Sequence, residues 1–499
     1  MRKLLLMSAL LLTGMSVFAQ YTIKGKVTDA KSGEVLRDVG VVLFQTDLGQ
    51  PTNEKGEFSF KDLEARRYWL VVYMVGYERY EQVIQLNGNV NLTIALEEST
   101  TSLEDVIVTG TRATENTPTT YTNISSAEIE KQNLGQDLPF LLNWTPSVVV
   151  TSDAGAGIGY TGVRIRGSDA ARINVTINGI PVNDSESQGV FWVNMPDLAT
   201  STSDIQVQRG VGTSTNGAGA FGGSINILTN GLSQRPKAEI TTTVGSYNTQ
   251  KYNAVFSTGL LKDKWAFGGR LSQITSDGFI DRASSDLQSY YVSGGYFGKS
   301  TSIKFITFGG SEVTYQSWFG TPEAKLRNDT AGIEAVIANN GYSAEQAANL
   351  RNSDRSFNFY LYDNQVDDYG QDHYQLHLGH IFSDKWSVNS ALHYTRGGGF
   401  FEEFRSDDDL ADYGLADVVI GANTISSTDL IRRRWLDNDF YGITYDFNFV
   451  GSKVEATLGG AFNQYDGDHF GEVIWAQFAS NGSITDRYYE STSDKSDFN

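Results

Sequence analysis

The sequence predicts a mainly β protein with a small N-terminal β-sandwich, an α/β domain and an antiparallel transmembrane β-barrel. Short segments with alternating polar and apolar residues recur along the chain. Aromatic residues are frequent, with 25 Tyr and 27 Phe against 5 Met, and none of the 499 residues is a cysteine. Mean hydropathy is −0.30, which is too polar for a helical membrane protein. The formal net charge of −20 argues against a nucleic-acid partner, which would require a basic face.

Residues 1–19 are typical of a signal peptide. Arg2 and Lys3 carry positive charge, residues 4–12 are apolar, and Val17-Phe18-Ala19 provides a small-residue cleavage site. The alternative is a membrane anchor, but the apolar run is short and the residues after it are polar. We therefore expect an exported protein whose mature chain begins at Gln20.

Residues 20–98 predict a small β-sandwich, because short alternating strands are separated by turn-forming residues. This segment resembles the carboxypeptidase-regulatory-like domain that precedes many Bacteroidota outer-membrane receptors. Arg67-Tyr68 stands where that family usually has a glycine before the tyrosine strand. No histidine pair or acidic base is present, so peptidase activity is not expected. The matching positions are Gly25, Val27, Asp29, Gly33, Gly56, Phe58, Gly76 and Tyr77.

Residues 99–117 are rich in Ser and Thr and predict a linker. The linker is interrupted by a β-forming run, Asp105-Val106-Ile107-Val108-Thr109. An unpaired strand is a liability unless the sheet edge of a partner pairs with it. The run could also be an edge strand of the following domain. It resembles the TonB box of TonB-dependent receptors, and the resemblance implies that TonB binds it.

Residues 118–230 mix short strands with helical segments and contain many glycines. Ser125 to Glu128 have the residue types of a helix cap, and Asn178-Gly179 is a hairpin-type turn. The sequence therefore predicts an α/β domain. Its strands are expected at 162–167, 173–177, 204–210 and 223–229.

The same segment resembles the plug domain of TonB-dependent receptors over roughly its whole length. The resemblance implies that Arg164, Arg166 and Arg209 pair with carboxylates of the barrel wall and lock the plug. Alternatively, these arginines are solvated on the face that lines the lumen. The residues that form the plug signature are Arg164, Arg166, Gly167, Asn178, Gly179, Arg209, Gly210, Gly222 and Gly223.

Residues 237–499 predict the strands of an outer-membrane barrel. Segments of about ten residues alternate apolar and polar side chains, which in such barrels face the lipid and the lumen respectively. Short and long connections follow one another in turn, as expected for periplasmic turns and extracellular loops. The long ones are expected at 277–289, 317–370 and 397–429. Aromatic residues at the start of the second are candidates for a ligand-facing surface: Tyr315, Trp318 and Phe319.

About ten strands can be counted, whereas a barrel that holds a plug needs about 22. A plug of about 110 residues would not fit inside ten strands, so the geometry predicts that the chain is an N-terminal fragment. No nucleophile–base pair stands out, and we predict no catalytic residue, cofactor or enzyme activity. His373, His377 and His380 invite a metal site, but in a strand the first two share one face and the third points to the other. A solvated barrel rim is the preferred interpretation, and we predict no metal site.

The resemblance implies a TonB-dependent transporter in the cell outer membrane, surrounded by its lipid. A small-molecule ligand would bind, TonB and its inner-membrane energising complex would pair with residues 105–109, and proton motive force would drive import. A ferric siderophore, haem or a similar chelate is the preferred ligand. An oligosaccharide importer of the starch-utilisation type, which would have a surface lipoprotein as partner, is the main alternative. A surface adhesin and a passive porin also remain open.

Overall fold

The structure of the chain is a computed structural model. It describes residues 20–97, 112–113, 117–211, 220–233 and 236–498, apart from 31, 45, 47, 75–76, 78–79, 263, 299, 384, 452–453 and 480–486. The predicted signal peptide (1–19) and the predicted TonB-binding strand (105–109) lie outside the described residues. The chain divides into two compact units, Met1–Asp105 and Val106–Asn499, and each is described by itself.

The first unit is a β-sandwich, as the sequence predicts. One sheet has the strand order β4-β1-β7 and the other β3-β2-β5-β6. The alternating side chains of both sheets meet in one apolar core, in which Ile23, Leu43 and Leu70 are fully buried. The strands are β1 (Tyr21–Asp29), β2 (Gly40–Phe44), β3 (Gly49–Pro51), β4 (Glu57–Leu63), β5 (Arg67–Tyr73), β6 (Tyr80–Gln85) and β7 (Val90–Leu96).

The second unit begins with an α/β domain, for which a five-stranded sheet in the order β12-β11-β14-β13-β8 forms the centre. β9 and β10 pair beside it as a separate two-stranded ladder. The strands are β8 (Thr120–Ser125), β9 (Val148–Ser152), β10 (Thr161–Ile165), β11 (Ile173–Ile177), β12 (Ile180–Pro181), β13 (Thr202–Arg209) and β14 (Gly223–Thr229). The helices are α2 (Ser126–Gln132), α3 (Leu138–Leu141), η3 (Ala170–Arg172), η4 (Trp192–Asn194) and η5 (Leu198–Ser201).

Local sequence signals explain much of this domain. The predicted cap is formed, because both the backbone N–H and the hydroxyl of Ser125 donate to the Glu128 carboxylate at 2.8 and 2.7 Å. Asn178 and Gly179 both have positive φ (56° and 80°), as a type I′ turn between β11 and β12 requires. The predicted strands 173–177 and 223–229 coincide with β11 and β14.

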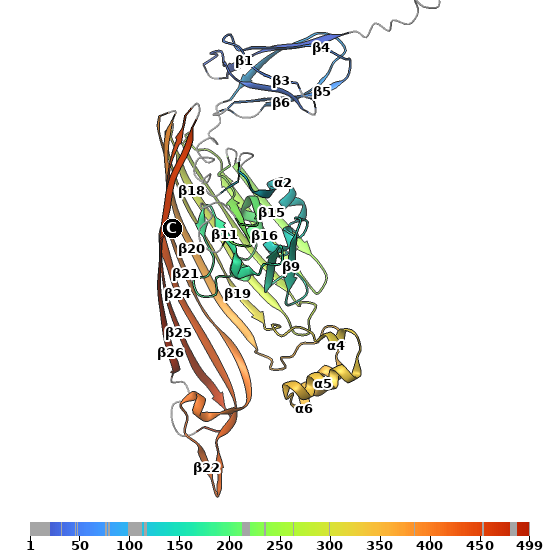
Figure 1. Cartoon of the computed structure of the whole chain (residues 1–499), viewed down its shortest axis with the longest axis vertical. Helices are drawn as coiled ribbons and strands as arrows, with labels where there is room; N and C mark the ends of the chain where they lie inside the picture. The colour runs from blue at the N-terminus through green and yellow to red at the C-terminus, as the bar shows by residue number, and fades with distance from the viewer. Residues whose placement is uncertain are drawn as a thin grey trace, which may run out of the picture. The chain divides into compact units, whose positions relative to one another are not determined.

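A ten-stranded antiparallel sheet forms the rest of the second unit, in agreement with the predicted strand count. Its order is β15-β16-β17-β18-β19-β20-β21-β24-β25-β26. It curves into a wall, and the α/β domain lies on its concave side (Figure 1). The strands are β15 (Pro236–Val244), β16 (Gln250–Thr258), β17 (Trp265–Ser276), β18 (Ser285–Phe297), β19 (Thr301–Tyr315), β20 (Val366–Ser383), β21 (Trp386–Asp409), β24 (Ser427–Val450), β25 (Glu455–Ala476) and β26 (Arg487–Phe498).

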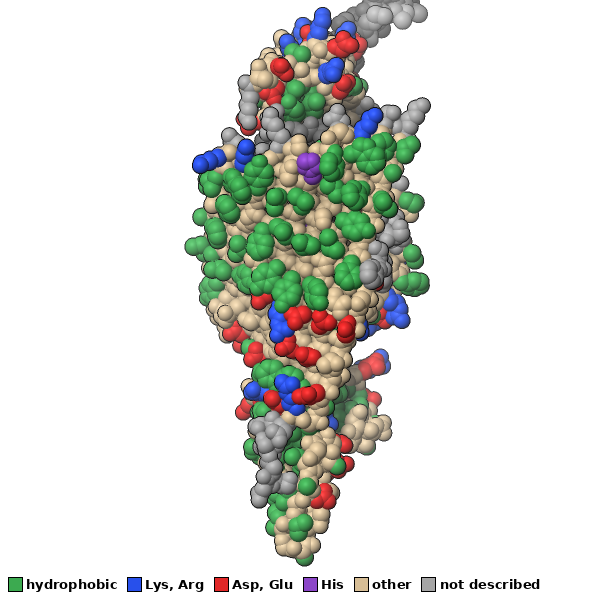
Figure 2. Space-filling view, turned by 90° about the vertical axis from the view of Figure 1, so that its left-hand side faces the viewer, with side chains coloured by type: hydrophobic (Ala, Val, Ile, Leu, Met, Phe, Trp, Pro, Cys, Tyr) green, Lys and Arg blue, Asp and Glu red, His purple; other side chains and the backbone are tan. Residues whose placement is uncertain are grey.

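The two faces of the wall differ in chemistry. Leu376 and Leu378 of β20 are exposed on the convex face, whereas Gln375 and His377, which alternate with them, are buried on the concave face. Apolar side chains cover the middle of the convex face in a band, and charged side chains gather beyond its border (Figure 2). Apolar-out and polar-in alternation of this kind is typical of a sheet that faces lipid on one side. Among the described residues, no helix is long and apolar enough to cross a membrane.

The connections correct two expectations. The segment 397–429 is not one long loop, because β21 continues to Asp409 and β24 begins at Ser427. The first connection is shorter than expected, since β18 begins at Ser285. The connection between β19 and β20 holds the expected helical segment. The remaining elements are α4 (Glu323–Leu326), α5 (Thr330–Asn340), α6 (Ala344–Asn352), η7 (Leu410–Tyr413), β22 (Val418–Ile420) and β23 (Asn423–Ile425).

Candidate functional site

The α/β domain is fastened to the wall by a buried cluster of charges around Asp197. Lys251 Nζ of β16 lies 2.6 Å from Asp197 Oδ1, and Arg270 NH1 of β17 lies 3.0 Å from Oδ2. Asn253 and Ser272 of the same strands donate to Oδ2 at 2.8 and 2.7 Å. One carboxylate of the domain is therefore held by four side chains of the wall.

The carboxylate of this cluster is paired with two cations. Burial alone would raise the pKa of Asp197, but Arg270 and Lys251 lower it to about 2. The carboxylate is therefore ionised at physiological pH. Arg270 NH1 also donates to the Asp197 carbonyl oxygen at 2.8 Å, and Thr200 donates to Oδ1 at 2.6 Å. A buried carboxylate is tolerated when its lone pairs are satisfied in this way.

A second attachment lies at the Asn178-Gly179 turn. Asn178 Oδ1 accepts the backbone N–H of Thr229 at 3.0 Å, which ties the turn to β14. Asn178 Nδ2 donates to Gln375 Oε1 of β20 at 2.9 Å, which ties the same turn to the wall. At Gly310 of β19 the wall comes so close to the domain that a Cβ atom would lie 2.9 Å from Pro196 Cδ. The contact is therefore close as well as polar.

The three arginines of the plug signature lie elsewhere. Arg166 NH2 donates to Thr120 Oγ1 and Arg209 NH1 to the carbonyl oxygen of Pro146, both at 3.4 Å and both within the domain. Among the described residues, neither these two nor Arg164 forms an ion pair with a carboxylate of the wall. The expected lock is instead found with its charges reversed, because the wall supplies the cations and the domain supplies Asp197.

The remaining signature residues shape the domain itself. Gly167 has a φ of +80° two residues after the end of β10, and the Gly210 N–H donates to the Gly222 carbonyl oxygen at 3.0 Å. A Cβ atom at Gly223 would lie 2.7 Å from the Gln208 carbonyl oxygen of the neighbouring strand. The signature therefore holds β10, β13 and β14 together. Like the arginines, these glycines do not line the cavity described next.

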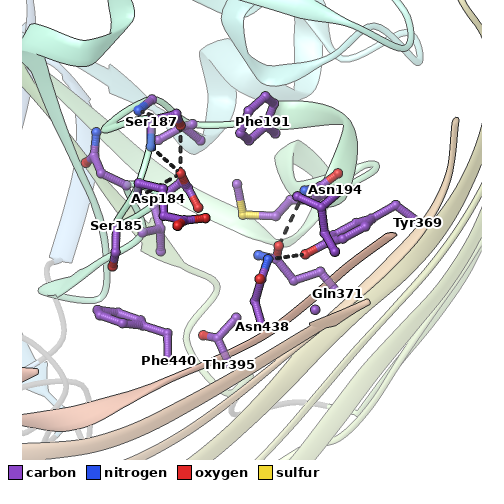
Figure 3. A pocket seen from close by; sticks show the side chains of 18 of the residues that line it. Asp184, Ser185, Ser187, Phe191, Asn194, Tyr369, Gln371, Thr395, Asn438 and Phe440 are labelled. Carbon is purple, nitrogen blue, oxygen red and sulfur yellow. Dashed lines mark hydrogen bonds between the residues drawn. The ribbon is translucent and has the colours of Figure 1, made fainter. Parts of the chain in front are cut away.

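A cavity of about 540 Å³ lies between the domain and the wall. On one side it is lined by residues of the α/β domain: Asp153, Tyr160, 181–187, 189–191 and 194–195. Strands β20, β21, β24 and β25 of the wall line the opposite side. Asp184 and Ser187 of the domain lie across the cavity from Asn438 and Phe440 of the wall (Figure 3). The cavity lies toward the end of the wall that carries α4 to α6, because its β20 residues are near the start of that strand.

Hydrogen bonds fix the shape of this cavity. Asp184 Oδ1 accepts the backbone N–H and the hydroxyl of Ser187 at 2.6 and 2.7 Å and so closes a turn in the domain loop. Asn194 Nδ2 donates to Gln371 Oε1 at 3.4 Å and links loop to wall (Figure 3). The cavity is pre-formed and mixes rings, amides and carboxylates, as small-molecule sites often do.

The structure separates the three aromatic candidates. Trp318 lines the cavity. Tyr315 is only 7% exposed, and its hydroxyl donates to the Tyr362 carbonyl oxygen at 2.7 Å, which corrects its placement on an exposed surface. Phe319 is exposed and packs at 4.7 Å between ring centroids against Phe359, outside the cavity.

Comparison with known proteins agrees with the geometry. Residues 113–224 match the TonB-dependent Receptor Plug Domain family. This part of the chain is therefore similar to a TonB-dependent receptor plug, and we call it the plug. The plug is the α/β domain described above, and residues 23–108, which contain the β-sandwich, match the CarboxypepD_reg-like domain family.

Two solved structures share the fold of the plug and its wall. P. aeruginosa FpvA, in complex with a heterologous pyoverdine and Fe, is 15% identical with a TM-score of 0.52, and the match covers 79% of this chain and 49% of FpvA. BauA, the ferric preacinetobactin receptor from Acinetobacter baumannii, is 12% identical with a TM-score of 0.53, and the match covers 78% of this chain and 55% of BauA. The chain therefore spans about half the length of these receptors.

The prediction from sequence missed the residues that matter most at the plug–wall contact. No sequence motif singles out Asp197, Lys251 or Arg270. Lys251 and Arg270 lie at inward-facing positions of strands whose side chains alternate between exposed and buried, and a buried charge needs a partner. Asp153 and Tyr160, which line the cavity, belong to no recognisable sequence motif. Their role depends on the loop that brings them to the wall.

Proposed function

We propose that this protein is a TonB-dependent transporter that imports a scarce small ligand across the outer membrane. The observation that carries the proposal is the plug latched by Asp197 onto the concave face of a sheet whose convex face is apolar. A passive porin needs an open lumen and has no use for such a plug. A surface adhesin needs neither a plug nor a segment that reaches a periplasmic partner.

Energy has to reach the plug from outside the barrel, because the outer membrane has no proton gradient of its own. The segment Asp105 to Thr109 is proposed to supply the link, by adding as a strand to a sheet edge of TonB. Force on this segment would then be transmitted to the plug. Import requires the plug to shift against the contacts of Asp197 and Asn178 with the wall.

The ligand is proposed to bind in the cavity between the plug and the wall. A compact chelate is the first candidate, in line with the pyoverdine complex of FpvA and the ferric preacinetobactin specificity of BauA. An oligosaccharide is the second candidate, because the rings and amides of the cavity also suit a hydroxyl-rich ligand. Receptor abundance in the native host separates the two. A rise under iron starvation alone supports the chelate, and a rise on a complex glycan alone supports the oligosaccharide.

The coupling to TonB is tested by a binding measurement that needs no knowledge of the ligand. The full receptor is purified, and its binding to the purified carboxy-terminal domain of TonB from the same host is measured. Ile107→Pro removes a backbone donor from the proposed strand and should abolish binding. Ser102→Pro, in the same linker but outside the strand, is the control and should bind normally. Unchanged binding by Ile107→Pro would contradict the assignment of the strand, and absence of binding to the unaltered receptor would contradict TonB dependence.

A further inference from the structure

One end of the cavity, which we call the Tyr160 corner, combines aromatic rings with carboxylates. It consists of Tyr160, Trp318, Phe401, Asp153 and Asp367, all of which line the cavity. The rings of Tyr160 and Trp318 are 5.4 Å apart between centroids, and those of Trp318 and Phe401 are 5.7 Å apart. Both pairs are edge-to-face, so the three rings form adjoining walls of the corner rather than a stack.

The two carboxylates reach the corner from opposite sides of the cavity. Asp153 belongs to the plug, where its backbone N–H donates to the Tyr160 carbonyl oxygen at 3.0 Å. Asp367 belongs to β20 and accepts a hydrogen bond from the Tyr160 hydroxyl. The described residues include no hydrogen bond or ion pair of the Asp153 carboxylate, so this group is available to a ligand.

Behind the corner lies a third carboxylate. Glu312 of β19 is 1% exposed, and neither of its oxygens has a hydrogen-bond partner among the described residues. It lies opposite Tyr369 in the strand register, on the same face of the sheet as Asp367, and it acts electrostatically on both Asp367 and Tyr160. A buried carboxylate without a partner is costly, and nearby positive charge relieves that cost.

The described residues that line the cavity offer no lysine or arginine for this purpose. Within the described part of the chain, the lining of the cavity contains four carboxylates and no Lys or Arg. Arg434 approaches the corner from outside this lining, with its guanidinium carbon 5.4 Å from the centre of the Phe401 ring. At the opposite end of the cavity His469 pairs with Glu186 at 2.6 Å, and Lys495 donates to the Ser185 carbonyl oxygen at 2.8 Å. Arg396 is held by Asp437 and Asp439. The Tyr160 corner therefore has two carboxylates, Asp153 and Asp367, and no cation among the described residues that line it.

Burial changes the acidity of Asp153 in the corner. It raises the pKa of Asp153 to about 6, because the carboxylate loses hydration and no neighbouring cation replaces it. At neutral pH the group is still mostly ionised. A cation that entered the corner would therefore find a negative charge that is poorly solvated and would be attracted strongly.

We propose that the Tyr160 corner binds a positively charged group, an ammonium or guanidinium, carried by the transported ligand. The inference rests on the proposed function in that the cavity is taken as the ligand site. Carboxylates supply opposite charge, and ring faces attract cations through their quadrupole. A ligand that presents a carboxylate, phosphate or other anion at this end meets repulsion from Asp153 and Asp367. The corner therefore selects cationic ligands over anionic chelates.

The test uses three small probes that share a phenyl ring and differ in charge: phenethylammonium, phenethyl alcohol and phenylpropionate. Their binding to the full receptor in detergent is measured by ligand-observed NMR and by the fluorescence of tryptophan, since Trp318 lies in the corner. Phenethylammonium is expected to bind at least about tenfold more tightly than the other two, which corresponds to one charge-assisted contact. Its binding should weaken as the pH falls through 6, where Asp153 takes up a proton.

Matched variants assign the binding to the corner. Asp153→Asn keeps the shape of the side chain, breaks no described hydrogen bond, and should weaken binding of phenethylammonium about tenfold. Asp169→Asn makes the same change at an exposed carboxylate of the plug outside the cavity and should leave this binding unchanged. Equal binding of the three probes, preference for phenylpropionate, absence of phenethylammonium binding, or equal loss in the two variants would each overturn the inference. None of these results bears on TonB binding, so the two proposals fail separately.

Discussion

Lys251 Nζ lies 2.6 Å from Asp197 Oδ1, and both side chains are almost completely buried where the plug meets the wall. The pair joins two parts of the protein that would have to shift against each other in the proposed transport. Arg270 completes the contact from the adjacent strand. A contact made of charges can be released in water at modest cost, because each ion regains its hydration, whereas inside the protein the ions depend on one another. This makes the cluster a firm but reversible attachment.

Removal of the central carboxylate should loosen the plug. In Asp197→Asn two buried cations lose their counter-charge, and we expect a loss of about 3–5 kcal/mol in stability of the plug–wall contact. Hydrogen exchange of β11 and β14, measured by mass spectrometry on the purified receptor, should be faster in the variant. Asp169→Asn, which removes an exposed ion pair with Arg172, is the control and should exchange like the unaltered protein. Normal protection in Asp197→Asn would show that the cluster does not hold the plug.

The same carboxylate predicts a dependence on pH. Since its pKa is about 2 in the folded protein and near 3.9 in an unfolded chain, its contribution is complete above about pH 5 and is lost as the pH falls toward 2. Thermal unfolding between pH 3 and pH 6 should therefore show a smaller loss on acidification in Asp197→Asn than in the unaltered protein. An identical loss in both would assign the acid sensitivity to other groups.

A second plug carboxylate should behave in the opposite way. Burial raises the pKa of Asp137 to about 8, with Thr161 Oγ1 donating to Oδ2 at 2.9 Å. The folded form thus keeps its proton between about pH 4 and pH 8 while the unfolded form loses it, so stability falls as pH rises through this window. We expect Asp137→Asn to be more stable than the unaltered protein at pH 8, and this difference to vanish at pH 4. Equal thermal midpoints at pH 8 would contradict the prediction.

The turn that joins plug and wall can be dissected by two substitutions. Asn178→Ala loses three hydrogen bonds and puts Ala, which tolerates a φ of 56° less well than Asn, in the turn, with an expected cost of about 2–4 kcal/mol. Asn178→Gly loses the same bonds but adopts this φ freely, so it should cost about 1–2 kcal/mol less. Thermal unfolding of the two variants measures the difference. Equal midpoints would mean that the backbone of the turn is not constrained.

The convex face of the wall should tolerate no charge. Leu376 lies within the apolar band, and Leu376→Arg is expected to cost about 2–4 kcal/mol because lipid cannot hydrate the guanidinium. Leu326→Arg serves as the control, because Leu326 of α4, between β19 and β20, is exposed to a similar extent as Leu376. The amount of heat-modifiable folded receptor in outer membranes should fall in the first variant only. Similar levels of both variants would contradict the assignment of this face to lipid.

Many features of this fold follow from the sequence because they are local. Alternation with a period of two determines that Leu376 and Gln375 face opposite sides of a strand, whichever strands lie beside it. The Asn178-Gly179 turn and the Ser125–Glu128 cap depend on residues within four positions of one another. For the same reason the sequence alone predicted the ten-stranded sheet, the β-sandwich and the α/β character of the plug.

Tertiary structure alone decided which polar residues meet. Asp197 and Lys251 are 54 positions apart, and their contact depends on how the plug turns against β16, which no periodicity encodes. Of the two expectations for the signature arginines, the lock is not observed among the described residues, because Arg166 and Arg209 donate hydrogen bonds to acceptors within the plug. The extension of β21 to Asp409 depends on backbone pairing with β24 across the sheet rather than on side-chain alternation. Asp153, Asp367 and Glu312 likewise come together only because the plug loop seats on two neighbouring strands of the wall. Charge complementarity over such distances is a property of the folded surface, and a residue's partner there is set by register and docking rather than by its neighbours in sequence.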